Sequence, residues 1–355
     1  MFKLLAVAGL SATGLAVGML SYRTILQHER ASTLTITASE GIDEGAFVRL
    51  GGTEQWVQIR GENVNNSVLL VLHGGPGMSY VPFTALFKSW EQHFTVVQWE
   101  RRGVGKTLAL NGEEPKGSLS FRRLSADGIE LAEYLRGRLH QEKLILLGHS
   151  VGSVIGVRMV KERPDLFHAY VGTDQIVDMA LNESVSYQML VERVAARGDA
   201  KLQQEVADIG APPYTDVNRW FNKQRLISAT DPVVTGFENK LFRMIATAPG
   251  YSMKEMMALG QGLKYSAAAL LPEMMTLNLR ALGATIELPV VFILAENDVL
   301  DPTALAVEYF NAIVAPRKDL AMLKGTGHSA VLINSDEFLR ELLMRVRPLA
   351  SARVR

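Results

Sequence analysis

One stretch decides the fold of this chain: Lys143-Leu144-Ile145-Leu146-Leu147-Gly148-His149-Ser150-Val151-Gly152-Ser153. An apolar run typical of a buried β-strand ends at Gly148, and a helical pattern begins directly after Ser150. In a strand–turn–helix context, Gly-x-Ser-x-Gly forms a nucleophile elbow, a tight turn that holds the serine hydroxyl where a substrate can reach it. Because the five-residue motif also occurs in unrelated turns, the rest of the chain must support Ser150 as a nucleophile.

The composition is that of an ordinary folded protein. Of the 355 residues, 48% are hydrophobic and 21% are charged, so the chain can bury a large core. The formal net charge is zero, which argues against nucleic acid as a partner. The chain has no cysteine, which excludes disulfides, thiolate metal sites and cysteine nucleophiles.

The N-terminus differs from the rest. Residues 4–20 carry no charge and are almost entirely apolar or small, so the run just reaches the lower limit for a membrane span. It is longer than the core of a signal peptide, and no small-x-small cleavage site precedes Ser21. We therefore predict that residues 1–23 form an uncleaved membrane anchor and that the catalytic domain lies outside the cytoplasm. The alternative is a secretory signal whose cleavage leaves a secreted or periplasmic protein.

Strand and helix patterns alternate after a polar tether at residues 24–44. This alternation predicts the α/β class, with a mainly parallel sheet covered by helices on both faces. The pattern predicts strands at 47–50 and 55–60 (a hairpin), 68–72, 94–99, 144–147, 169–172, 288–294 and 320–323, and core helices at 124–139, 151–163, 304–313 and 337–346.

Strand signals are missing for more than a hundred residues in the middle of the chain. Residues 179–282 are helical in pattern and rich in methionine. The economical interpretation is an α/β core at 45–177 and 288–346, interrupted by a helical cap at 178–287.

A serine nucleophile needs a histidine base and a carboxylate that orients the base. Hydrolases built on such an elbow place these residues in the chain order serine, acid, histidine. His328 follows the last strand in a glycine-rich loop, which makes it the predicted base. Three carboxylates, Glu296, Asp298 and Asp301, follow the strand that ends at Leu294, and all three are admissible as the acid.

The negative charge that develops on an attacked carbonyl needs preorganised hydrogen-bond donors. The amide of Val151 directly follows the nucleophile and is one predicted donor. The second is the amide of Gly75, in the loop His73-Gly74-Gly75-Pro76-Gly77 that follows a central strand. We expect His73 to support this loop.

Taken together, these motifs resemble the α/β-hydrolase superfamily and, within it, the proline iminopeptidase-like (prolyl aminopeptidase) group. The resemblance covers roughly residues 45–345. The segments that carry it are His73–Gly77, Gln98-Trp99-Glu100-Arg101-Arg102-Gly103-Val104-Gly105-Lys106-Thr107, the elbow, and the acid and histidine loops. It implies an α/β-hydrolase fold with an inserted helical cap. It also favours Asp298 as the acid, since Asp-x-x-x-Pro with Pro302 resembles the acid loop of known hydrolases. Asp301 would then be the N-cap residue of the next helix.

The chain departs from the peptidases of this group in two places. Glu100-Arg101-Arg102-Gly103 stands where Asp-Gln-Arg-Gly is usual, and Val151 stands where tryptophan usually follows the nucleophile. Peptidase members use cap glutamates to bind the free amine of the substrate. Glu183 and Glu192 are possible counterparts, although a solvated helix face is the favoured interpretation of both.

The sequence thus predicts a Ser150-Asp298-His328 hydrolase that works through an acyl-enzyme, without a cofactor or metal. The leading substrate is a short peptide or amide with N-terminal proline or another apolar residue. A small ester or lactone is the second candidate. A further alternative is a non-catalytic member of the fold that binds a ligand. The sequence does not indicate an oligomeric state.

Overall fold

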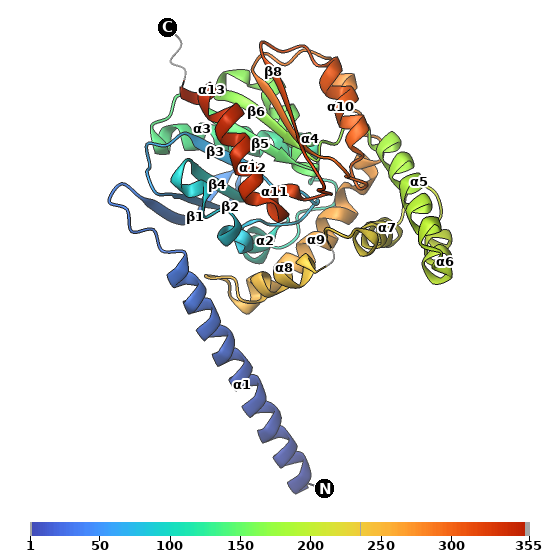
Figure 1. Cartoon of the computed structure of the whole chain (residues 1–355). Coiled ribbons are helices and arrows are strands. Elements are labelled where there is room, and N and C mark those ends of the chain that lie inside the picture. The colour runs from blue at the N-terminus through green and yellow to red at the C-terminus, as the bar shows by residue number, and fades with distance from the viewer. Residues whose placement is uncertain (1, 235, 352–355) are drawn as a thin grey trace.

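The computed structural model describes residues 2–234 and 236–351, with side chains described from residue 17 to 350. Its centre is an eight-stranded sheet with the order β1-β2-β4-β3-β5-β6-β7-β8 (Figure 1). β2 runs antiparallel to both of its neighbours, and the other pairs are parallel. The strands are β1 Ile42–Leu50, β2 Thr53–Gly61, β3 Val68–Leu72, β4 Thr95–Glu100, β5 Leu144–His149, β6 Phe167–Thr173, β7 Val290–Ala295 and β8 Lys318–Leu323.

Both faces of the sheet are buried, which explains why its central strands are continuously apolar. Alternate residues of β3 face opposite sides: Leu70 belongs to one core cluster and Leu69 to the other. The first cluster contains residues of α3 (Phe121–Leu139), α4 (Val151–Glu162) and α10 (Thr303–Ala312). The second contains residues of the 3₁₀ turns η1 (Val81–Leu86) and η2 (Trp90–Gln92), and of α12 (Ser335–Glu341) with the π-helical turn η5 (Leu342–Val346) that follows it. The predicted sheet covered on both faces is confirmed.

The cap forms between β6 and β7, as the methionine-rich pattern predicts. Its helices in the described part of the chain are α5 Met179–Arg197, α6 Ala200–Ile209, α7 Val217–Thr230, α8 Phe237–Ala246 and α9 Met253–Met274. Several of them begin at a residue whose side chain accepts a hydrogen bond from a first-turn amide, such as Asp178 for α5 and Ser252 for α9. The cap helices lie together outside the core, at the right and lower edge of the molecule in Figure 1.

The segment expected to be a tether is partly helical, which corrects that prediction. α1 runs from Phe2 to Thr33, and β1 begins at Ile42. Tertiary contacts account for the extra helical turns. Arg23 donates to the carbonyl oxygens of Ala246 and Tyr251, and Gln27 donates to that of Tyr251 as well. Contacts more than 200 residues apart leave no trace in the local pattern of residues 24–33.

The predicted membrane anchor at residues 1–23 lies largely outside the residues whose side chains are described. Among the described residues, no helix has both the length and the apolar character that a membrane crossing needs. The anchor stays a prediction.

Candidate active site

Ser150 lies in a strained turn between β5, which ends at His149, and α4, which begins at Val151. Its φ of 51° and ψ of −122° are unusual for a residue with a side chain. The flanking glycines make the turn possible: a Cβ on Gly152 would collide with the backbone of β3 at Leu72, and one on Gly148 would lie 2.8 Å from the Cα of Ser153. The predicted strand–turn–helix elbow is confirmed.

His328 follows β8 and meets one of the three candidate acids directly. Its Nδ1 lies 2.9 Å from Oδ2 of Asp298, which follows β7. The other oxygen of Asp298 accepts hydrogen bonds from the amides of Leu300 and Asp301, at 2.8 and 2.9 Å. Burial alone would lower the pKa of His328, but the carboxylates of Asp298 and Asp174 outweigh it and raise this pKa to about 10. The carboxylate of Asp298 therefore fixes and stabilises a protonated imidazole.

Asp301 does not cap the next helix, contrary to the prediction. Pro302 occupies the N-cap position of α10 and makes no side-chain cap. The Asp301 side chain is buried beside the site: Oδ1 accepts a 3.2 Å hydrogen bond from Asn182 of the cap, and Oδ2 lies 3.9 Å from Nδ1 of His328. Burial, with the neighbouring carboxylates of Asp298 and Asp174, raises the pKa of Asp301 to about 7, although the positive charge of His328 opposes this rise. Pro302 supplies the restricted φ at the helix start, which frees Asp301 to face the site.

Glu296 is the third candidate acid, and the structure places it away from His328. It is exposed, and its carboxylate accepts a 2.9 Å hydrogen bond from the amide of Gly325. This contact ties the loop after β7 to the loop after β8. Of the three sequence candidates, the structure brings Asp298 and Asp301 to the histidine.

Asp174 is a carboxylate at the site that the sequence analysis did not consider. It directly follows β6, and its Oδ2 accepts hydrogen bonds from Nε2 of His149 at 2.8 Å and from the amide of Ser329 at 2.7 Å. The same oxygen lies 3.7 Å from Nδ1 of His328. The signal that points to Asp298 and Asp301, a carboxylate shortly after the end of a strand, is present at Asp174 as well.

His149 connects Asp174 to the loop after β3. Its Nδ1 lies 2.5 Å from the hydroxyl of Tyr80, and burial lowers the pKa of His149. A neutral ring that donates from Nε2 to Asp174 must accept at Nδ1, so the network assigns the tautomer and makes Tyr80 the donor. Both rings of the pair His149 and His328 lie near the nucleophile, with centroids 5.2 Å apart.

A buried arginine holds the loop that carries the predicted oxyanion donor Gly75. Arg101 is fully buried and donates to the carbonyl oxygens of His73, Gly75 and Pro76, at 2.9, 2.8 and 3.2 Å. Burial lowers the pKa of Arg101 to about 9. Gly75 has a φ of +57°, which a side chain would disfavour. His73, expected to support this loop, hydrogen-bonds to the carbonyl of its neighbour Gly74 at 3.0 Å.

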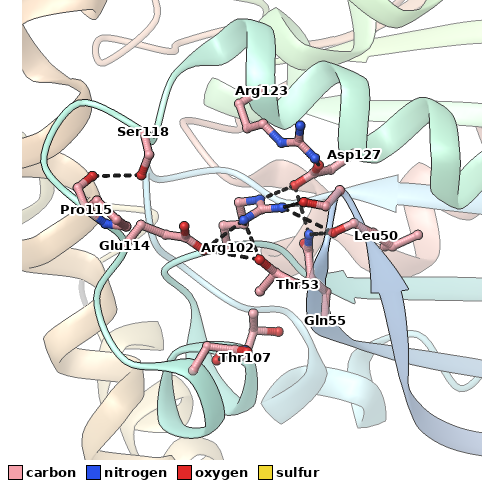
Figure 2. A network of polar contacts seen from close by, with 12 residues as sticks. Leu50, Thr53, Gln55, Arg102, Thr107, Glu114, Pro115, Ser118, Arg123 and Asp127 are labelled. Atoms are coloured by element: carbon pink, nitrogen blue, oxygen red, sulfur yellow. Dashed lines mark hydrogen bonds and ion pairs between the residues drawn. The ribbon is translucent and has the colours of Figure 1, made fainter.

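The other two charged residues of the Glu100-Arg101-Arg102-Gly103 motif hold different parts of the molecule. Glu100 accepts hydrogen bonds from the amide of Lys106 at 2.6 Å and from the hydroxyl of Tyr251 at 2.5 Å, which joins the core to the cap. Arg102 lies at the centre of the network in Figure 2, between the β1–β2 hairpin and α3. It contacts Asp127 and Thr53 at 2.5 Å and Glu114 at 2.8 Å.

The site opens into a cavity of about 310 Å³ between the core and the cap. Ser150, Val151, Gly75 and His328 all line it. As the first residue of α4, Val151 has an amide without an acceptor inside the helix, which suits its predicted role as an oxyanion donor. Apolar side chains supply much of the remaining lining: Met78, Ile176, Met179, Phe221, Leu263, Met274 and Leu300.

The two cap glutamates have different environments. Glu192 is exposed and accepts a 2.8 Å hydrogen bond from Gln188, as expected of a solvated helix face. Glu183 is buried, lines the cavity, and pairs with Lys223 at 2.6 Å, so the favoured interpretation was wrong for this residue. Lys223 belongs to α7, and no local pattern connects it with a glutamate on α5.

A larger hollow of about 800 Å³ lies between the end of α1, the β1–β2 hairpin and α8. Neither Ser150 nor His328 lines it. Two cations in its wall, Arg60 and Lys106, are already paired with Glu91 and Glu255. The chemistry of the elbow therefore belongs to the smaller cavity.

Two overlapping groups of side chains near the elbow have the composition of a metal site. They are His149, Asp174 and His328, and Asp298, Asp301 and His328. Within each group a histidine nitrogen and a carboxylate oxygen are already joined by a hydrogen bond, at 2.8 Å for His149 and Asp174 and at 2.9 Å for His328 and Asp298. This arrangement suits proton transfer between the groups.

Residues 68–341 match the model of the alpha/beta hydrolase family. The chain is 30% identical over 308 residues to probable aminopeptidase YbaC of Bacillus subtilis, covering 84% of this chain and 94% of the relative. It is 25% identical over 194 residues to a proline iminopeptidase of Thermoplasma volcanium, and the match covers 53% of this chain and 62% of the relative. Its fold resembles that of a proline iminopeptidase-related protein from Thermus thermophilus, with a TM-score of 0.58, 20% identity, and coverage of 87% of this chain and 99% of the other.

Proposed function

We propose that this chain, which belongs to the alpha/beta hydrolase family, is a serine hydrolase that cleaves an ester or amide bond through an acyl-enzyme. The observation that carries the proposal is the 2.9 Å contact between Asp298 and His328, because His328 lines the same cavity as Ser150. A strained nucleophile, a base and an orienting carboxylate together are what acyl transfer requires.

The reaction begins when Ser150 Oγ attacks the substrate carbonyl and its proton passes to Nε2 of His328. The protonated imidazole is stabilised by Asp298, whose carboxylate faces Nδ1. The amides of Gly75 and Val151 donate to the oxyanion. His328 then gives its proton to the departing alcohol or amine. Water attacks the acyl-enzyme in the same way, releases the carboxylic acid and restores Ser150.

Two substrate classes are compatible with this mechanism. The names of the relatives support a peptide or amide with an apolar N-terminal residue, with Glu183 as the candidate partner of the free amine. The apolar lining of the cavity supports a small ester or lactone. A cavity of about 310 Å³ favours a compact acyl group in both classes. The non-catalytic alternative is disfavoured because a binding protein needs none of the strain at Ser150.

Residues 1–23 would tether this hydrolase to a membrane and leave the catalytic domain outside the cytoplasm. The apolar run at residues 4–20 supports this part of the proposal. It is tested by comparing extraction of the full chain with that of a chain that begins at Ile42. The full chain should require detergent, and the truncated chain should be released by buffer; release of both by buffer contradicts the tether.

A fluorophosphonate probe tests the catalytic proposal without knowledge of the substrate. The wild-type protein should be labelled at Ser150, and Ser150→Ala should abolish both labelling and turnover while the protein stays folded. Ser153→Ala is the matched control, since Ser153 is one helical turn away and its hydroxyl is occupied with the carbonyl of Ser150 at 2.6 Å. Labelling that survives in Ser150→Ala would sink the mechanism.

A further inference from the structure

An ion pair between two side chains of the cap lies at the wall of the active-site cavity. Glu183 on α5 lines the cavity, and its Oε2 lies 2.6 Å from Nζ of Lys223 on α7. Both side chains are almost completely buried. Since a buried charge is retained only where it is paired, the two residues form one neutral unit.

The ammonium of Lys223 and the carboxylate of Glu183 each make further contacts within the protein. Lys223 Nζ donates to Ser186 Oγ at 3.1 Å and lies 6.0 Å from the centre of the Tyr214 ring. Glu183 Oε1 accepts a 3.2 Å hydrogen bond from Nε1 of Trp220. The carboxylate therefore reaches the cavity already neutralised on one oxygen and hydrogen-bonded on the other.

A substrate with a free α-amine brings a positive charge into this cavity. The ammonium would need a carboxylate without its own cation, but Glu183 has Lys223 beside it. The other charged groups that line the cavity are Arg225, His328 and Asp301. Two of these are basic, and Asp301 is held by Asn182 next to the catalytic histidine.

We infer that the buried Glu183–Lys223 pair excludes a free α-amine from the acyl pocket, so that the enzyme acts on esters or amides of uncharged acyl groups. This inference rests on the proposed serine hydrolase function. It separates the two substrate classes that the mechanism leaves open, and it assigns Glu183 and Lys223 as specificity-determining residues. The uncharged acyl chain would pack against apolar lining such as Met179, Phe221 and Met274.

Two substrates that differ only in the amine test the inference: 4-nitrophenyl 4-methylpentanoate and leucine 4-nitrophenyl ester. Each kcat/KM is measured at pH 6.5, where the α-amine is largely protonated, and divided by the spontaneous hydrolysis rate. We expect the uncharged ester to be preferred about 100-fold or more, because an unpaired ammonium would be buried in the complex. The preference should narrow at pH 9, where the amine has lost its proton. Equal rates, or a preference for the leucine ester, would overturn the inference.

Variants of the pair show whether these two residues cause the preference. Lys223→Met leaves a carboxylate at the cavity without its cation, and the preference should move toward the leucine ester by about tenfold. In the double variant Glu183→Gln/Lys223→Met the carboxylate is absent too, so the preference for the uncharged ester should remain. An unchanged preference in folded Lys223→Met contradicts the assignment. If Lys223→Met does not fold, the inference is tested by the preference of the wild-type protein between the two esters.

Labelling of Ser150 separates failure of the inference from failure of the proposed function. Without fluorophosphonate labelling in the wild-type protein, the hydrolase proposal itself fails. If labelling occurs but neither ester is turned over, the inference is tested by protection of Ser150 against the probe. In that experiment 4-methylpentanamide should slow the labelling more than leucinamide does. Stronger protection by leucinamide would show that the pocket accepts the amine.

Discussion

The guanidinium of Arg101 donates a 2.8 Å hydrogen bond to the carbonyl oxygen of Gly75, the residue whose amide is predicted to bind the oxyanion. Arg101 is fully buried, and it also binds the carbonyl oxygens on either side of the Gly74–Gly75 segment. A fixed positive charge thus lies behind the predicted oxyanion loop in a medium where charges are weakly screened. It holds the loop in shape and favours negative charge in front of it.

Replacing this cation should therefore weaken transition-state stabilisation more than substrate binding. We expect Arg101→Met to lower kcat by about 10- to 100-fold while KM changes less than about threefold. Arg101→Lys keeps the charge but loses the planar fork, so its kcat should be intermediate. Steady-state kinetics on a short-chain aryl ester measure both variants. A rise in KM at unchanged kcat would show that Arg101 serves binding instead.

The three carboxylates around His328 should differ sharply in importance. Asp298 meets Nδ1 at 2.9 Å, whereas Asp301 remains 3.9 Å away. We expect Asp298→Asn to lower kcat by about 10³- to 10⁴-fold, because the imidazolium loses its partner and the ring its tautomer. Asp301→Asn should lower kcat less than about tenfold, since no direct hydrogen bond to His328 is lost. The reverse ranking would make Asp301 the catalytic acid. The same kinetic measurement on Asp174→Asn tests the third carboxylate, whose Oδ2 lies 3.7 Å from Nδ1 of His328.

The raised pKa of His328 predicts how activity and stability depend on pH. Only the neutral imidazole can accept the proton of Ser150, so kcat/KM should rise with pH toward the pKa of about 10. Stability has the opposite trend. A raised histidine pKa stabilises the fold fully below the unfolded value of about 6.5, and this contribution is lost as pH rises from there to about 10.

Chemical denaturation checks the stability half of this prediction. The difference in unfolding free energy between wild-type protein and His328→Gln should be larger at pH 6 than at pH 9.5. Taking the difference between the two proteins cancels the titration of distant groups. An equal difference at both pH values would mean that the carboxylates around His328 do not favour its charged form.

Arg102 should matter for stability and not for catalysis. Its guanidinium pairs with Asp127 in the interior and joins the hairpin to α3 (Figure 2). We expect Arg102→Met to lower the free energy of unfolding by about 3 kcal/mol or more, since Asp127 is left buried with fewer partners. The control Arg163→Met removes ion pairs with the exposed side chains of Asp165 and Glu133 and should lower the free energy of unfolding far less than Arg102→Met does. Urea titrations compare the two; equal losses would contradict this account of the network.

Local patterns account for the parts of the site that lie within single segments. The elbow at Ser150 follows from a strand, two glycines and a helix that are contiguous in the chain, and the contact between His328 and an acid after β7 follows from chain order. Where the prediction was wrong, the cause was a distant partner. Asp301 has the pattern of a helix cap but faces His328 and Asn182, and Glu183 has the pattern of a solvated residue but meets Lys223.

The sequence by itself determined the α/β core, the interrupting cap and the tight turn at Ser150, and it singled out His328 as the candidate base, because periodicity and turn chemistry act between neighbours in the chain. Only the tertiary structure decided which carboxylates surround His328, that Arg101 supports the oxyanion loop, and that Lys223 neutralises Glu183. These contacts join loops and helices that are far apart in the sequence, and they depend on how the loops meet at the edge of the sheet and how the cap packs over it. That is why a candidate catalytic site could be proposed from the chain, whereas the character of the substrate pocket could not.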